Sequence, residues 1–197
     1  LARSGVEVIV ICEQILEQPE VNIEIIQVEL APERPRWKSM KLFRTRVDKS
    51  LEARFSGCPI LIHSHERTLR HNVTTFHGPP INIAFHWKWL FRFSRRVRAW
   101  SRMECDELLG PNVELVLPVS SKIKKQLEAQ YPEICNKSIE LAWPGITTKV
   151  FQKTDKVLKN SNEIRCLFVG REWKRKGLDK AVKVVKYLRS SQQKDVS

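Results

Sequence analysis

The residues best suited to chemistry lie in segment 167–178, which holds Arg171 and Lys176 between Gly170 and Gly177. An apolar strand is predicted to end at Gly170, and a helix to begin near Gly177. Ligands in open α/β sheets bind just beyond the carboxyl ends of the strands, and Arg and Lys there form charge-assisted hydrogen bonds to phosphate. Arg171 and Lys176 are therefore candidates for holding a phosphate group. The alternative is a solvated basic turn, and charge alone does not decide between the two.

His77 is the second candidate for chemistry. It follows a predicted strand at 73–76 and begins the sequence His-Gly-Pro-Pro, in which Gly78 lets a ligand or another backbone approach closely. A histidine at the end of a strand can donate a hydrogen bond to a substrate hydroxyl or act as an acid or base. The alternative is a capping histidine bonded to backbone. The remaining histidines lack the spacing of a metal-binding helix, so no metal site is predicted: His63, His65, His71 and His86.

A basic and aromatic segment runs from Trp87 to Arg102 and contains no acidic residue. Aromatic rings settle at the headgroup level of a bilayer while cations pair with anionic lipid, so this segment is predicted to contact an anionic membrane surface. The same composition would suit single-stranded nucleic acid. A third alternative is an aromatic stripe that faces the core, with a solvated basic back. Residues 34–49 add further cations as a candidate part of the same face.

Composition sets bounds on these alternatives. The chain has 197 residues, of which 42% are hydrophobic and 29% charged, which excludes collagen-like and fully disordered chains. No run approaches the roughly 20 apolar residues of a membrane span. A net charge of +13 calls for an anionic partner: nucleic acid, a phosphorylated substrate or an acidic membrane. The five cysteines are widely spaced and mostly beside apolar runs, so we predict reduced, mostly structural thiols in a cytosolic setting.

Short apolar strands alternate with amphipathic helices along the chain. The alternation predicts an α/β fold, a Rossmann-like doubly wound parallel sheet, in which strand 6–12 is buried on both faces. Residues 1–5 are predicted to end a helix at Gly5. A polar stretch at 152–163 separates a first domain, 1–145, from a second part, 146–197, that is too short to bury a core alone. The predicted strands are 6–12, 21–30, 59–63, 73–76, 113–119, 139–142 and 165–169, and the predicted helices are 40–55, 94–109, 121–130 and 178–188.

Four motifs, taken in order, resemble glycosyltransferase family 4, whose members have two facing Rossmann domains in the GT-B fold. Their order, approximate spacing and strand or loop contexts match the family over nearly the whole chain. The resemblance is closest to enzymes that add sugars to the lipopolysaccharide core, which also carry a basic and aromatic segment in the N-terminal domain. The motifs are Thr75-Phe76-His77-Gly78, then Val116-Leu117-Pro118-Val119-Ser120-Ser121-Lys122-Ile123-Lys124, then Pro144-Gly145-Ile146 with Phe151, and Val169-Gly170-Arg171 with Lys176-Gly177-Leu178.

The resemblance implies a retaining transfer of a sugar from a nucleotide-sugar donor to a membrane-held glycolipid or lipopolysaccharide-type acceptor. Gly170, Arg171 and Lys176 match the residues that hold the donor diphosphate, where the two cations stabilise the charge that gathers on the leaving nucleotide. His77 matches the histidine that hydrogen-bonds the donor sugar. The family needs no metal and no cofactor besides its donor substrate. The resemblance places the protein in the cytoplasm, peripheral at the inner face of the membrane.

Three departures from the family are visible. The glycine-rich loop after the first strand and the acidic E-x7-E motif are absent from the sequence, and Thr147 stands where the family commonly has Asp. We therefore expect a piece of a longer enzyme: an acceptor-side N-terminal domain without its first strand, and the start of a nucleotide-sugar-binding C-terminal domain. The alternatives are a non-catalytic membrane-associating remnant, a nucleotide-sugar epimerase of the same architecture, and a nucleic-acid-binding module. Only charge favours the last, because no nucleic-acid-binding motif accompanies it.

Overall fold

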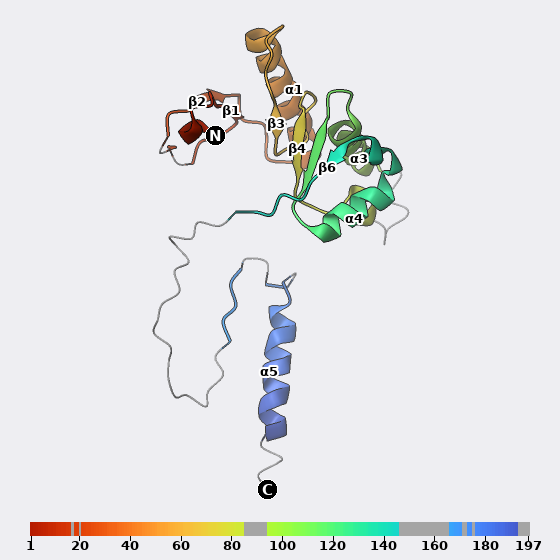
Figure 1. Cartoon of the computed structure of the whole chain (residues 1–197). Helices are drawn as coiled ribbons and strands as arrows, with labels where there is room; N and C mark the ends of the chain where they lie inside the picture. The colour runs from red at the N-terminus through yellow and green to blue at the C-terminus, as the bar shows by residue number, and fades with distance from the viewer. Residues whose placement is uncertain are drawn as a thin grey trace. The chain divides into compact units, whose positions relative to one another are not determined.

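The computed structural model describes residues 1–16, 18–19, 21–84, 94–145, 166–170, 173–174 and 176–192. The chain divides into two compact units, Leu1–Ile146 and Thr147–Ser197, one residue beyond the boundary predicted from sequence. Both sheets belong to the first unit, and the described part of the second unit contains one long helix (Figure 1).

All strand pairs in the described part of the first unit are parallel. A two-stranded sheet has the order β1-β2, and a four-stranded sheet has the order β3-β4-β5-β6. The α/β prediction with a parallel sheet is confirmed. The strands are β1 Ile9–Cys12, β2 Glu24–Gln27, β3 His63–Ser64, β4 Val73–Phe76, β5 Leu115–Pro118 and β6 Ser138–Ile139.

Local signals set the ends of the helices. Ser94 and Ser120 are the N-caps of α3 and α4, and their hydroxyls accept hydrogen bonds from the Val97 and Ile123 amides at 3.1 and 3.3 Å. Gly5 ends the first helical turn at φ 77°, a backbone conformation that glycine adopts without strain. The helices are α1 Arg36–Phe55, α2 Ile81–Ala84, α3 Arg95–Leu109, α4 Ser121–Gln130 and α5 Leu178–Gln192, with 3-10 turns at Ala2–Ser4 and Pro132–Asn136.

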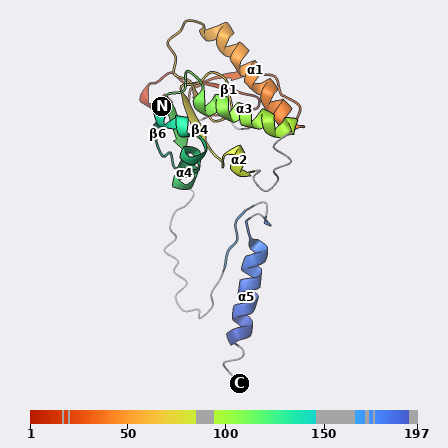
Figure 2. The same ribbon diagram turned by 90° about the vertical axis from the view of Figure 1, so that its right-hand side faces the viewer.

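The core of the first unit lies where the four-stranded sheet packs against α3, α4 and the Pro132–Asn136 turn. Helices α1 and α3 lie side by side (Figure 2), joined by an ion pair of 2.8 Å between Arg44 Nη2 and Asp106 Oδ2. None of the described helices is long and apolar enough to cross a membrane. The buried cluster in this core contains Phe76, Leu108, Val113, Val116, Leu127, Tyr131 and Ile134.

The strand predicted at 59–63 is wrong, because only His63–Ser64 forms a ladder with β4. Its register pairs His63 with Val73, so earlier residues run past the start of β4. At that point a side chain replaces the backbone partner, since Asn72 Oδ1 accepts a hydrogen bond from the Ile62 amide at 3.1 Å. Leu61 is left 75% exposed.

Of two further strand predictions, the one at 6–12 forms as β1 without the predicted burial on both faces, and the one at 165–169 does not form over its described residues. In the two-stranded sheet β1 pairs with β2, and Val10 remains 36% exposed, so this strand is not buried on both faces. The strand predicted at 165–169 does not form over residues 166–169, where the described part of the second unit offers no pairing strand. Leu167 and Val169 there are 89% and 77% exposed.

The cysteines are free thiols, as expected, but the prediction that they act as small core residues is wrong. Cys12 is half-buried and the other four are exposed. Cys135 shows the reason, since it follows the buried Ile134 in the Pro132–Asn136 turn but is itself exposed. An apolar neighbour in sequence therefore does not guarantee burial on an amphipathic element.

Candidate active site

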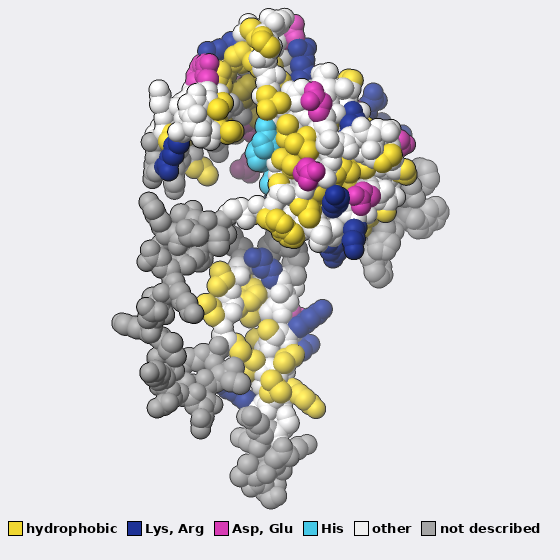
Figure 3. Space-filling view, in the orientation of Figure 1, with side chains coloured by type: hydrophobic (Ala, Val, Ile, Leu, Met, Phe, Trp, Pro, Cys, Tyr) yellow, Lys and Arg dark blue, Asp and Glu magenta, His cyan; other side chains and the backbone are white. Residues whose placement is uncertain are grey.

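The carboxyl ends of β3 and β4 open into a cleft of 490 Å³. His65 follows β3, while His77 and Gly78 follow β4, and both histidines are exposed. Imidazole side chains gather on one face of the first unit (Figure 3). The structure therefore places His77 where a ligand can reach it, as the position of the strand predicted. The cleft is lined by Arg36, Met40, His65, Glu66, Arg67, Thr75, Phe76, His77, Gly78, Ile81, Arg96, Trp100 and Glu107.

Three imidazoles form a row beside this cleft. The ring centroids of His63 and His65 are 4.5 Å apart, and those of His65 and His77 are 5.8 Å apart. His63 Nε2 is 2.8 Å from the Thr75 hydroxyl oxygen. Burial, with the neighbouring His65 and His71, lowers the pKa of His63, so its ring is neutral near pH 7.

Sequence reasoning missed this row, although a signal for it was present. His63 and His65 are two residues apart and therefore share one face of an extended segment, as do Thr75 and His77 on the neighbouring strand. Parallel pairing of β3 with β4 brings the two pairs together. Within the described ranges, no group of His, Cys, Asp and Glu side chains is arranged to hold a metal ion.

A largely buried ionic network forms part of the cleft wall, where Arg67 and Glu107 line it, and the sequence analysis did not identify it. Glu104 and Glu107 of α3 are 0% and 3% exposed. Arg67 bridges them, with its Nη2 2.9 Å from Glu104 Oε2 and its Nε 3.1 Å from Glu107 Oε2. Burial raises the pKa of Glu104 and raises the pKa of Glu107 to about 7. The signal available in sequence was weak, because an i, i+3 pair of glutamates on a helix is usually solvated.

The second unit places Lys176 against Gly170. A Cβ atom on Gly170 would lie 2.6 Å from Lys176 Nζ, and the φ of Gly170 is 154°, which disfavours any side chain. The Gly177 amide donates to the Lys174 carbonyl at 3.2 Å, in the turn that leads into α5. The predicted grouping of Gly170 with Lys176 is thus present, whereas Arg171 lies outside the described residues.

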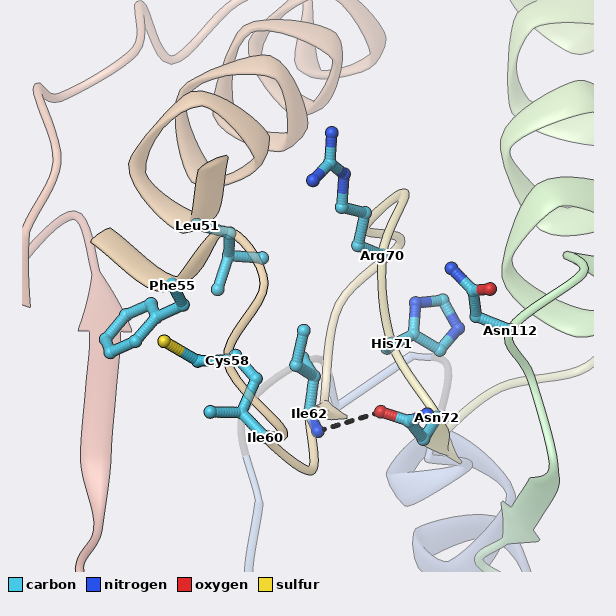
Figure 4. A pocket seen from close by; sticks show the side chains of 9 residues that line it. All are labelled: Leu51, Phe55, Cys58, Ile60, Ile62, Arg70, His71, Asn72 and Asn112. Carbon is cyan, nitrogen blue, oxygen red and sulfur yellow. Dashed lines mark hydrogen bonds between the residues drawn. The ribbon is translucent and has the colours of Figure 1, made fainter. Parts of the chain in front are cut away.

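A second hollow of 220 Å³ lies at the opposite, amino-terminal ends of the strands (Figure 4). Ile62 precedes β3 and Asn72 precedes β4, and both line it. Arg70 also lines this hollow, and its guanidinium forms an ion pair of 2.7 Å with Asp48 and a second ion pair with Glu52. None of the site residues predicted from sequence lines this pocket, so we assign it no role in the site.

The described part of the basic and aromatic segment belongs to α3. Val97 and Ala99 are buried, and Trp100 is half-buried at the cleft, with the Arg67 guanidinium carbon 5.1 Å from its ring centroid. The exposed arginines 95, 98 and 102 share the opposite face, since residues three and four apart on a helix are neighbours. This division is the one that the core-facing alternative predicts for residues 94–102. Residues 87–93 lie outside the described residues.

The sequence matches no family model and no curated protein. Among solved structures, the fold is similar to the crystal structure of WaaG, a glycosyltransferase involved in lipopolysaccharide biosynthesis, with a TM-score of 0.71 and 18% sequence identity. The match covers 92% of this chain and 51% of that chain, so this chain spans about half the length of WaaG. At this identity the similarity establishes the fold alone, and the predicted Rossmann-like GT-B fold class is confirmed.

Proposed function

We propose that the chain is part of a retaining glycosyltransferase of family 4, which moves a sugar from a nucleotide-sugar donor to a membrane-held glycolipid or lipopolysaccharide-type acceptor. The observation that carries this proposal is the position of His77, exposed at a cleft beyond the carboxyl end of β4. It occurs in a fold similar to that of the glycosyltransferase WaaG.

The proposed division of labour follows from charge. The departing nucleotide diphosphate gathers negative charge as the glycosidic bond breaks, and cations fixed nearby stabilise that charge. Lys176, held against Gly170, and Arg171 supply these cations in the proposal. His77 donates a hydrogen bond to the donor sugar, and the reaction needs no metal. The enzyme works at the cytoplasmic face of a membrane.

Binding of nucleoside diphosphates tests the proposed donor site. We expect one of UDP, GDP and ADP to bind the chain in a calorimetric titration, and the Arg171→Ala, Lys176→Ala double variant to bind it at least tenfold more weakly, because charge-assisted hydrogen bonds contribute about 1.5–3 kcal/mol each. The Lys183→Ala, Lys186→Ala variant removes two exposed cations from α5 and serves as the control. Equal losses in both variants, or no binding at all, would contradict the assignment.

The segment from Trp87 to Arg102 is proposed to dock the first unit on an anionic bilayer. Its support is the exposed face of Arg95, Arg98 and Arg102 on α3, together with the aromatic residues that precede it in sequence. Cations near an anionic leaflet contribute about 1 kcal/mol each to binding.

Co-sedimentation with vesicles tests this docking. The Arg98→Gln, Arg102→Gln variant is expected to bind vesicles of phosphatidylglycerol and phosphatidylcholine about tenfold more weakly or worse, and the Trp87→Ser, Trp89→Ser variant to lose binding. The Lys122→Gln, Lys125→Gln variant makes the same change of charge on the exposed side of α4 and should bind like the unmodified chain. If the α3 and α4 variants bind equally well, the segment is not the docking surface.

A further inference from the structure

The two buried glutamates of α3 have no part in the proposed chemistry. Buried ion pairs are a poor source of stability, because the cost of desolvation often exceeds the Coulombic gain and apolar residues of similar size serve as well or better. Glu104, at 0% exposure, and its partner Arg67 therefore call for another explanation. Their hydrogen bonds reach the two loops that carry His65 and His77.

Glu104 holds the loop that follows β4. The Ile81 amide, at the start of α2, donates to both of its carboxylate oxygens, at 2.9 Å to Oε1 and 3.1 Å to Oε2. Pro79 and Pro80 have no amide hydrogen, so the Ile81 amide is the first backbone donor after Gly78. The Tyr131 hydroxyl also donates to Oε1, at 2.6 Å, which further restrains the carboxylate. The four-residue turn from His77 is thus tied at one end by β4 and at the other by α3.

Arg67 holds the loop that follows β3. It lies two residues after His65, and its guanidinium bridges Glu104 and Glu107 while its carbon is 5.1 Å from the ring centroid of Trp100. Glu107 completes the attachment to β4, because its Oε1 accepts a hydrogen bond from the Thr74 hydroxyl at 3.0 Å. Both histidine loops are therefore attached to Glu104, while Glu107 bonds Arg67 and strand β4 itself. Helix α3 also lies against α2 (Figure 2).

We infer that Glu104 and Arg67 are positioning residues, which hold His77 and His65 at the cleft by tying their loops to α3. The inference rests on the proposed function in one respect: the proposed function supplies the substrate that would bind in the cleft. The hydrogen bonds and the buried carboxylates that carry it are independent of any reaction.

The test uses the full chain and measures amide hydrogen exchange together with the imidazole resonances. Glu104→Ala is expected to speed exchange of the Ile81 amide at least tenfold, without the same change at the core amide of Val116, and to shift the resonances of His77 and His65. Glu104→Gln retains an oxygen that can accept from the Ile81 amide, so it should restore much of that protection. Glu52→Ala is the control. It removes an exposed ion-pair partner of Arg70, which lies on the same β3–β4 loop as Arg67 but away from the cleft, and it should leave both signals unchanged.

Unchanged exchange of Ile81 in Glu104→Ala would overturn the inference, as would a rise that Val116 shares. If Glu104→Ala does not fold, Glu104→Asp carries the test, because it keeps the charge but withdraws the carboxylate by one methylene. Faster exchange confined to the loop then supports positioning, and no change overturns it. None of these signals involves a sugar or nucleotide, so failure of the proposed transfer would leave the result intact.

Discussion

Replacing Arg67 with Ala is expected to lower the free energy of unfolding by about 3–5 kcal/mol. The side chain is only 19% exposed, and it is the bridging cation between two carboxylates whose own side chains are at most 4% exposed. Its removal leaves buried negative charge without a bridging cation. Contact of the guanidinium with the Trp100 ring is lost as well, which adds about 0.5–1 kcal/mol.

Urea denaturation followed by tryptophan fluorescence measures this loss. Arg70→Ala is the matched control, because Arg70 lies on the same β3–β4 loop but forms its ion pairs with Asp48 and Glu52 at the surface. Exposed pairs contribute little, so the control should shift the urea midpoint far less. If the two variants unfold at the same urea concentration, the ionic network of Arg67, Glu104 and Glu107 does not stabilise the fold as described.

A pH dependence is the second large effect. Burial raises the pKa of Glu107 from its ordinary 4.5 to about 7, although the charge of Arg67 lowers it in part. Between these values the folded chain binds more protons at this site than the unfolded chain. The contribution of Glu107 is therefore fully present below pH 4.5 and is lost as the pH rises through about 7. At about 1.4 kcal/mol for each pKa unit, the loss is about 3 kcal/mol.

Comparison with Glu107→Gln isolates this contribution. Burial also lowers the pKa of His63 and His71, which makes stability rise with pH over an overlapping range and masks the Glu107 effect in the unmodified chain alone. The variant cannot titrate at position 107, so its stability relative to the unmodified chain should increase steadily from pH 4.5 to 7. Glu128→Gln makes the same substitution at an exposed position on α4. A difference for Glu107→Gln that stays constant with pH would contradict the raised pKa.

The elements that the sequence predicted well have local causes. Ser94 and Ser120 cap α3 and α4 through bonds within the first turn, and β4 forms at its predicted residues. The predictions for strands β1 and β3 were less accurate, because the burial and length of each strand depend on which strand lies beside it. That information comes from tertiary pairing and from the Asn72 side chain, which meets Ile62 at the start of β4.

The sequence predicted those parts of the candidate site whose residues lie within one short segment of the chain. His77 followed from the end of a strand, and Lys176 with Gly170 from a short turn. The cleft itself needs Arg36 from α1 and Trp100 from α3, which only packing brings to the same place. Trp100 illustrates the difference, since its basic neighbours in sequence suggested a membrane surface whereas its spatial neighbour is Arg67.

The central claim of the proposed function is that His77, at the cleft of the first unit, hydrogen-bonds the sugar of a nucleotide-sugar donor. It is tested most directly by titrating the chain and its His77→Ala variant with a nucleoside diphosphate and with the matching nucleotide sugar. The expected result is that His77→Ala weakens binding of the nucleotide sugar about tenfold, the loss of roughly one hydrogen bond, and leaves the diphosphate unaffected. Affinity for the nucleotide sugar that does not change in the variant would contradict the claim.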